Sequence, residues 1–206
     1  EMCIRDRNKA AMIAESRALR AFYYWYIMDN FGDAPLVTEP TSELPVKTSR
    51  KDLYDFIVKE LKESFSDLPT EKNESNYGRF TLWGAKALLA NVYLNAEVYT
   101  GTPQWSAAAE YSKKVMDAGF SLAPNYGDNF LADNNTSPEM ILPICYDGVQ
   151  TRSWSGLFFI ASFISGDMNA LVDFGTKEAW GGNRARMALV KKFASDGDLS
   201  KTTDTR

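Results

Sequence analysis

The stretch Ala21–Leu36, which reads AFYYWYIMDNFGDAPL, decides how the chain folds. Five aromatic residues stand in succession at the end of a helical pattern, and the sequence Asn-Phe-Gly-Asp-Ala-Pro then stops that pattern. Aromatic side chains are the largest apolar groups, so the cluster forms either a core seam or a ligand surface. Phe22 and Trp25 fall on the apolar stripe of the helix, whereas Tyr23 and Tyr24 do not. We therefore expect core packing, with tyrosine hydroxyls that reach the surface.

Apolar residues that recur every three or four positions predict further helices along the chain. The expected helices span about residues 8–29, 50–67, 82–99, 103–118 and 184–194. Ser49, Thr81 and Thr102 stand where N-caps are expected. A tight turn joins the third and fourth helices, which predicts an antiparallel hairpin. The expected inward-facing residues include Trp105, Val115 and Met116 in the fourth helix, and Leu189 and Phe193 in the last one.

The composition changes after Gly119, where Asn, Asp, Gly and Pro become frequent and no regular period is sustained. The apolar stretch Met140–Tyr146 contains one proline and predicts a short strand, which an edge position would suit. The fold class expected is mainly α. Tetratricopeptide-like stacked helix hairpins occupy 8–119, and an irregular, loop-rich ligand-binding part with short strands occupies 120–206.

The two ends of the chain do not fit a complete domain. Residues 1–7 sit awkwardly against the helix that follows, and they are interpreted as a non-native segment. The carboxyl end, Leu199–Arg206, stops without a cap. We expect 8–206 to be a partial domain, truncated at both ends.

The composition excludes several classes of function. The chain has no histidine, which removes Ser-His and Cys-His catalysis and the commonest transition-metal ligand. Cys3 and Cys145 lack the spacing of metal ligands, so no metal or other cofactor is expected. A net charge of −4 without a long basic run argues against nucleic acid as a partner. No stretch approaches the roughly 20 continuous apolar residues of a membrane span.

The candidate ligand-binding residues are aromatic and fork-shaped polar side chains within segments rich in Gly and Ser. They are Tyr146, Arg152, Trp154, Trp180, Asn183 and Arg184. A sugar needs a flat apolar face to stack on and polar side chains that meet its hydroxyls, and this set supplies both. The alternative is an aromatic plug that fills an irregular loop region.

Three weaker signals have simpler explanations. Asp196-Gly197-Asp198 could contact Ca²⁺, but a solvated turn explains it better. Gly181-Gly182 could cradle an anion before the last helix, but a plain turn also explains it. Asp167 and Asp173 could form a glycosidase pair, although any acidic protein offers such candidates.

Several segments, in order, resemble the SusD/RagB family of Bacteroidetes outer-membrane nutrient-binding lipoproteins. They are Glu15–Tyr24 with Asn30–Leu36, Arg79–Ala90, Tyr93–Tyr99 followed by Trp105, and Ser137–Ile141. The resemblance implies tetratricopeptide-like hairpins that carry an irregular ligand-binding part. It also implies an outer-membrane, cell-surface location through a lipid anchor that lies outside this chain. The implied partners are a glycan and a SusC-like TonB-dependent transporter.

The leading hypothesis is a non-enzymatic glycan-binding subunit of a nutrient import complex. A helical-repeat adaptor for proteins is the first alternative, and it predicts an exposed apolar stripe on the hairpins. An α-helical glycosidase is the second, and it predicts two facing carboxylates in a cleft.

Overall fold

The computed structural model describes residues 6–131, 133–146, 150, 164, 169, 172, 180–182 and 184–203. The chain divides into two compact units, Glu1–Ile144 and Cys145–Arg206. The first unit contains α1 (Asp6–Phe31), β1 (Ala34–Pro35), β2 (Lys47–Thr48), α2 (Arg50–Ser64), η1 (Glu74–Asn76), α3 (Leu82–Leu94), α4 (Ala96–Thr100), α5 (Trp105–Met116), η2 (Tyr126–Phe130) and η3 (Asn134–Thr136). The second contains α8 (Met187–Phe193) and η4 (Leu199–Lys201). No described helix is both long enough and apolar enough to cross a membrane.

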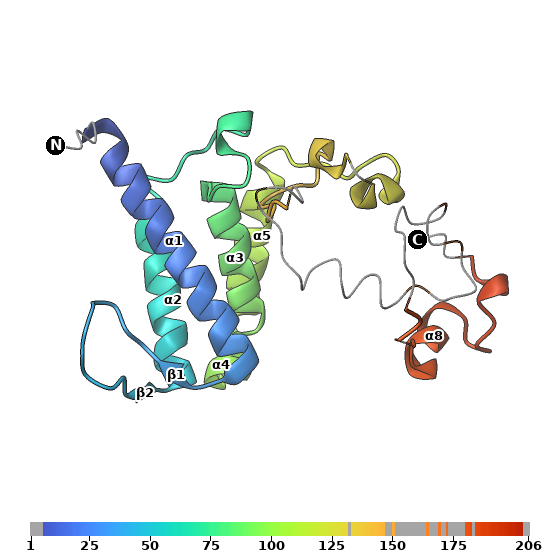
Figure 1. Cartoon of the computed structure of the whole chain (residues 1–206), viewed down its shortest axis with the longest axis horizontal. Coiled ribbons are helices and arrows are strands. Elements are labelled where there is room, and N and C mark those ends of the chain that lie inside the picture. Colours follow the sequence, from blue (N-terminus) through green and yellow to red (C-terminus); the bar gives the residue numbers. More distant parts are fainter. Residues whose placement is uncertain are drawn as a thin grey trace. The chain divides into compact units, whose positions relative to one another are not determined.

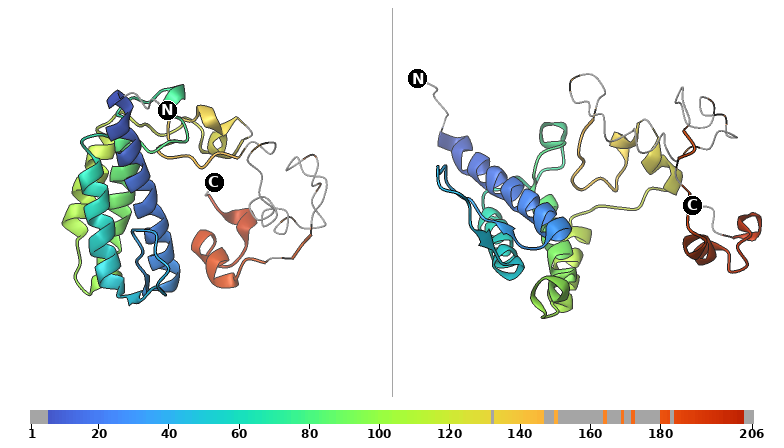
Figure 2. Two further views of the ribbon diagram at one scale, coloured as in Figure 1. Left: turned by 60° about the vertical axis from the view of Figure 1, so that its left-hand side comes forward. Right: turned by 60° about the horizontal axis from the view of Figure 1, so that its bottom comes forward.

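Two antiparallel helix pairs, α1 with α2 and α3 with α5, form the first unit, and α2 also packs against α3 and α4 (Figures 1 and 2). The direction of the first pair follows from its contacts, because Arg17 pairs with Glu63 and Arg20 with Glu60. This stacked arrangement confirms the expected tetratricopeptide-like architecture.

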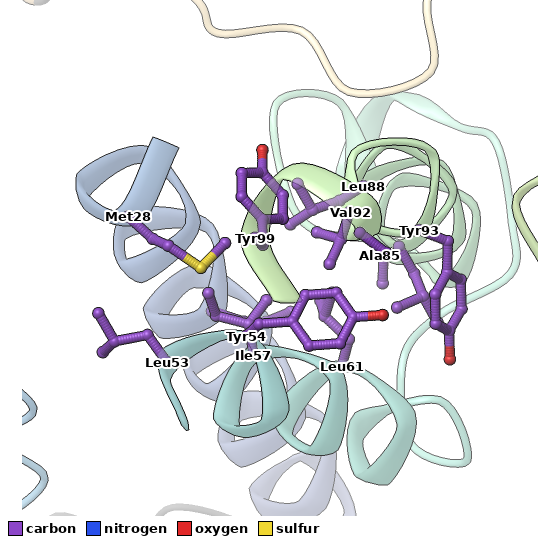
Figure 3. Packing of buried hydrophobic residues seen from close by; sticks show 14 of the residues in the cluster. Met28, Leu53, Tyr54, Ile57, Leu61, Ala85, Leu88, Val92, Tyr93 and Tyr99 are labelled. Carbon is purple, nitrogen blue, oxygen red and sulfur yellow. The ribbon is translucent and has the colours of Figure 1, made fainter. Parts of the chain in front are cut away.

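The core lies where α1, α2, α3 and α4 meet (Figure 3). Its fully buried side chains include Met28, Leu53, Ile57, Leu61, Leu89 and Val92. Alanines such as Ala18 and Ala85, also fully buried, allow neighbouring helices to approach closely. Leu53, Ile57 and Leu61 recur every four residues and are fully buried, which agrees with the apolar period that predicted a helix over 50–67.

The aromatic cluster is part of this core. Phe22, Tyr24 and Trp25 are partly buried against it, whereas Tyr23 and Tyr26 are exposed. The expectation was wrong for Tyr24, because its ring meets the Phe56 ring edge-on with centroids 5.5 Å apart. Tyr24 therefore belongs to the seam between α1 and α2.

A buried tyrosine ties α4 to α1. The Tyr99 hydroxyl donates to Asp29 Oδ1 at 2.6 Å. Burial, together with this hydrogen bond, raises the pKa of Tyr99 to about 12, so the phenol stays protonated. Neutral Tyr99 thus donates to an exposed carboxylate of the first helix pair.

The predicted caps are confirmed at two of three helix starts. The Ser49 hydroxyl accepts from Asp52 N at 3.1 Å, and Thr81 Oγ1 accepts from Gly84 N at 3.3 Å. The prediction was wrong for Thr102, because α5 begins at Trp105 with Gln104 as the N-cap. Thr102 instead lies in the preceding turn, where its N–H donates to Thr100 Oγ1 at 3.1 Å.

The helices of the second pair differ from the expectation at other points. Asn95 interrupts the expected 82–99 helix and separates α3 from α4. Trp105 and Met116 are exposed, although they were expected to face inward. They are the first and last residues of α5. Val115 is buried, as expected.

The strand expected over Met140–Tyr146 is wrong. These residues form turns and irregular backbone, and the sheet among the described residues has two strands, β1 and β2, with Ala34 opposite Thr48. Met140 N donates to Ser137 O in a turn, and Pro143 has no N–H to give to a ladder. The apolar character of the segment serves packing instead, since Leu142 lies against Gly84 of α3.

The last helix is shorter than expected. It begins at Met187 rather than near residue 184, and Leu189 and Phe193 are exposed. Their inward orientation was therefore a wrong prediction. A helix of two turns has few positions with which to cover an apolar face.

Candidate functional site

Two of the candidate residues of the second unit, Trp180 and Arg184, belong to one described turn around Gly181. Trp180 is 49% exposed and Arg184 is exposed. Gly181 N donates to Ile164 O at 2.9 Å, while Gly181 O accepts from Arg184 Nη1 at 2.8 Å. Gly181 has a φ of 61°, which other residues rarely adopt, so glycine suits this position. The turn therefore holds the Trp180 backbone and the Arg184 guanidinium close to each other.

The remaining candidates fall into two groups. Tyr146 is 64% exposed at the start of the second unit and is not a residue of this turn. Arg152, Trp154 and Asn183 lie outside the described residues. The structure thus brings together Trp180 and Arg184 of the predicted set.

The Gly181-Gly182 pair forms part of this turn and not the start of a helix. The N-cap of α8 is Arg186, and no side chain caps it. The turn interpretation is therefore the one that the geometry favours.

The acidic turn near the carboxyl end engages a lysine. Lys201 Nζ lies 2.9 Å from Asp198 Oδ2 and 3.3 Å from Asp196 Oδ2. The Asp198 N–H and then Lys201 lower the pKa of Asp196, and the Ser200 hydroxyl and then Lys201 lower the pKa of Asp198. The two carboxylates thus already have a cationic partner, as a solvated turn would provide. Asp167 and Asp173 lie outside the described residues.

The first unit contains a hollow that sequence reasoning missed. It measures about 630 Å³, and its lining residues lie within 71–81, at Phe120 and within 135–143. We call it the loop hollow. The residues that line it include Tyr77 and Phe120 together with Asn73, Asn76 and Asn135. No sequence period could reveal it, because three separate loops contribute and each has an ordinary loop composition.

A second hollow, of about 730 Å³, lies on α1 and α2 beside a cluster of charged side chains. Glu60 accepts from Arg17 at 2.9 Å and also pairs with Arg20. Burial alone would raise the pKa of Glu60, but the hydrogen bonds from Arg17 and Arg20 outweigh it and lower this pKa. The charges are thus compensated within the cluster, which gives it a structural role between two helices.

An exposed apolar stripe runs along α1 on the face away from the core. Its members are Met12, Leu19, Tyr23, Tyr26 and Ile27. Their spacing places them on one side of the helix. The adaptor hypothesis predicted such a stripe.

Comparison with known proteins identifies related sequences along the chain. A family described as "Starch-binding associating with outer membrane" matches residues 4–94. The starch-binding protein SusD of Bacteroides thetaiotaomicron is 39% identical over 196 residues, which cover 93% of this chain and 35% of that protein.

Solved structures agree with this match. A crystal structure with xylogluco-oligosaccharide has a TM-score of 0.63 and 28% identity, over 73% of this chain and 32% of that one. Surface glycan-binding protein A of Bacteroides thetaiotaomicron, in complex with laminarihexaose, has a TM-score of 0.59 and 28% identity, over 70% and 30%. The chain spans about a third of the length of these relatives.

Proposed function

Because the chain belongs to the SusD/RagB family, we propose that it is part of a cell-surface glycan-binding subunit of a TonB-dependent nutrient import complex. The observation that carries this proposal is the 39% identity to a starch-binding protein along 93% of the chain. Two structural relatives whose descriptions name bound oligosaccharides support the same class of ligand.

The turn at Trp180 supplies the chemistry that such binding needs. An exposed indole offers a flat apolar face on which a pyranose ring can stack, and it has few rotatable bonds to immobilise. The Arg184 guanidinium offers several donors to sugar hydroxyls or to a carboxylate. We propose that Trp154, Arg152, Asn183 and Tyr146 extend this surface.

Membership of the family also suggests a cellular location and a partner for the protein. We propose that the full-length protein is lipid-anchored at the outer membrane and hands its glycan to a SusC-like transporter. The family description, which names association with the outer membrane, supports the location. We further propose binding without catalysis, since the relatives are named as binding proteins.

A protein-binding surface is a second candidate function. The exposed apolar stripe on α1 favours it, because contiguous exposed apolar residues often mark protein contacts. This role is compatible with glycan binding, since an import subunit needs both a ligand and a transporter.

Calorimetric titration with laminarihexaose tests the proposed surface. We expect Trp154→Ala and Trp180→Ala each to weaken binding roughly tenfold, which corresponds to about 1.4 kcal/mol for a lost stacking contact. Trp105→Ala is the matched control, because Trp105 is also an exposed tryptophan, 59% against 49% for Trp180, but lies on α5. Unchanged affinity in both test variants would contradict the assignment of the site.

A further inference from the structure

We propose that the loop hollow of the first unit is a second carbohydrate-binding site, and that it takes a neutral sugar ring of the same glycan. The choice of ligand class rests on the proposed function. Three features of the loop hollow support the site itself: the hydrogen bonds that hold its walls, the aromatic residues in its lining and the net charge of that lining.

The first wall of the hollow is held by hydrogen bonds within a short turn. Asn73 Oδ1 accepts from Asn76 N at 3.2 Å and caps η1. Asn76 Nδ2 donates to Glu71 O at 2.9 Å. These bonds use one polar atom of each amide, so Asn73 Nδ2 and Asn76 Oδ1 remain available for a ligand.

Lys72 fastens this wall to the second one. Its ammonium donates to Ala118 O at 2.9 Å and to Gly119 O at 2.8 Å, and it lies 4.3 Å from the centroid of the Phe120 ring. Such a position over an aromatic face is favourable for a cation. Lys72 thus donates two of its three N–H groups to backbone carbonyls, and its ammonium lies over the Phe120 ring.

The third wall is held by Glu139. Its Oε1 accepts from Ala123 N and from Asn129 Nδ2, both at 2.9 Å, and Asn129 in turn accepts from the Ser137 hydroxyl. The backbone N–H of Ala123 and then the Asn129 amide lower the pKa of Glu139, so the network persists at neutral pH. A preformed wall lowers the entropy that a ligand loses on binding.

The lining suits a hydroxylated ring. Tyr77 is 42% exposed and offers an aromatic face, while Met140 adds apolar surface nearby. The Asn135 side chain makes no hydrogen bond to another described residue and can both donate and accept. An apolar face beside convergent amides is the combination that recognises sugars.

The charge of the lining selects against anions. Glu71 and Glu74 contribute two negative charges, and Lys72, which is already engaged, contributes one positive charge. A phosphate or uronate would meet a net negative wall whose one cation already bonds two backbone carbonyls. The loop hollow should therefore prefer neutral sugars, in contrast to the turn that holds Arg184.

Amide NMR of the 206-residue chain, titrated with laminarihexaose, tests the inference. We expect chemical-shift changes in residues 73–77 and 135–141 that persist in Trp180→Ala. The double variant Tyr77→Ala with Asn135→Ala should lose these changes and weaken binding at least fivefold in the Trp180→Ala background. An oligogalacturonate of similar length should leave the same residues unchanged.

Tyr26→Ala is the control, because Tyr26 is an exposed tyrosine on α1 outside the hollow. An unchanged spectrum elsewhere in the double variant establishes that it remains folded. Shift changes confined to the Trp180 turn would overturn this inference and leave the proposed function standing. No shift change anywhere would contradict both.

Discussion

Tyr24 illustrates how one residue of the aromatic cluster connects the core with the chain that follows. Its ring packs against Phe56, while its hydroxyl donates to Val37 O and accepts from Val37 N, each at 2.8 Å. The hydroxyl thus holds the connector after β1 to the end of α1. Tyr23, one position earlier, has an exposed ring, and its hydroxyl makes no hydrogen bond to another described residue.

Tyr24→Phe tests this role, because it keeps the ring and removes the hydroxyl. We expect the free energy of unfolding to fall by about 1 kcal/mol, the usual net value of such hydrogen bonds. Urea denaturation measures it. Tyr23→Phe is the control and should change stability by less than about 0.5 kcal/mol. Equal effects of the two substitutions would show that the Val37 contact contributes nothing.

Helix starts are the elements where sequence and structure can be compared most directly. Ser49 matched a capping pattern with Asp52, and its hydroxyl both accepts from Asp52 N and donates to Asp52 Oδ2 at 2.6 Å. Thr102 matched an equally plausible pattern with the following proline, yet α5 begins at Trp105, with Gln104 as its N-cap. A Ser or Thr in a suitable local sequence indicates a possible N-cap. The conformation of the neighbouring turn determines whether the helix begins at that residue.

Ser49→Ala and Thr102→Ala separate the two cases. Loss of the Ser49 cap should lower stability by about 1 kcal/mol, since one N–H at the start of α2 loses its acceptor. Thr102→Ala should have an effect below about 0.5 kcal/mol. Thermal or urea denaturation of both variants measures these two changes in stability. A larger loss for Thr102→Ala would mean that α5 begins earlier than the structure places it.

The helical elements could be predicted because a long apolar period has one main explanation. The stripe of α2 at Leu53, Ile57 and Leu61 shows this, since all three side chains are fully buried. The apolar stretch Met140–Tyr146 had two explanations, a strand or a packed loop. The turn bond from Met140 to Ser137 and the approach of Leu142 to Gly84, which is distant in sequence, favour the packed loop.

At the scale of the molecule, a cluster of ion-paired side chains links α1 with α2. Glu60 is almost fully buried and pairs with Arg17 and Arg20 of the opposite helix. The unfolded chain lacks these partners, so the pKa of Glu60 lies below 4.5 in the folded state only. The folded protein therefore binds fewer protons than the unfolded chain near this pH, and acid weakens the cluster.

Glu60→Gln should reveal this linkage. At pH 7 we expect the substitution to cost about 1.5–3 kcal/mol, the range for hydrogen bonds to a charged group. The contribution of Glu60 is fully present above pH 4.5 and is lost as the pH falls through the lowered pKa, so the difference from the wild type should narrow there. Urea denaturation at several pH values measures it.

Asp55→Asn provides the comparison for this experiment. Asp55 pairs with Lys51 within α2 at 2.7 Å, but both side chains are exposed. Exposed pairs contribute little, so we expect less than about 0.5 kcal/mol. A pH-independent difference between Glu60→Gln and the wild type would contradict the electrostatic explanation.

The site was less predictable than the fold. Trp180 and Arg184 are close in sequence, so composition alone could place them at one turn. The loop hollow joins Tyr77, Phe120 and Asn135, which no local pattern connects. Sites assembled from several loops become visible only when the packing of those loops is known.

Calorimetric titration of the 206-residue wild-type chain with laminarihexaose tests whether the protein binds a glycan. We expect saturable binding, with a negative change in heat capacity as apolar ring faces leave water. Binding should be indifferent to moderate salt, because the proposed ligand is neutral. The absence of saturable binding to laminarihexaose, to xylogluco-oligosaccharide and to a starch-derived malto-oligosaccharide, by a chain shown to be folded, would contradict the proposed glycan binding.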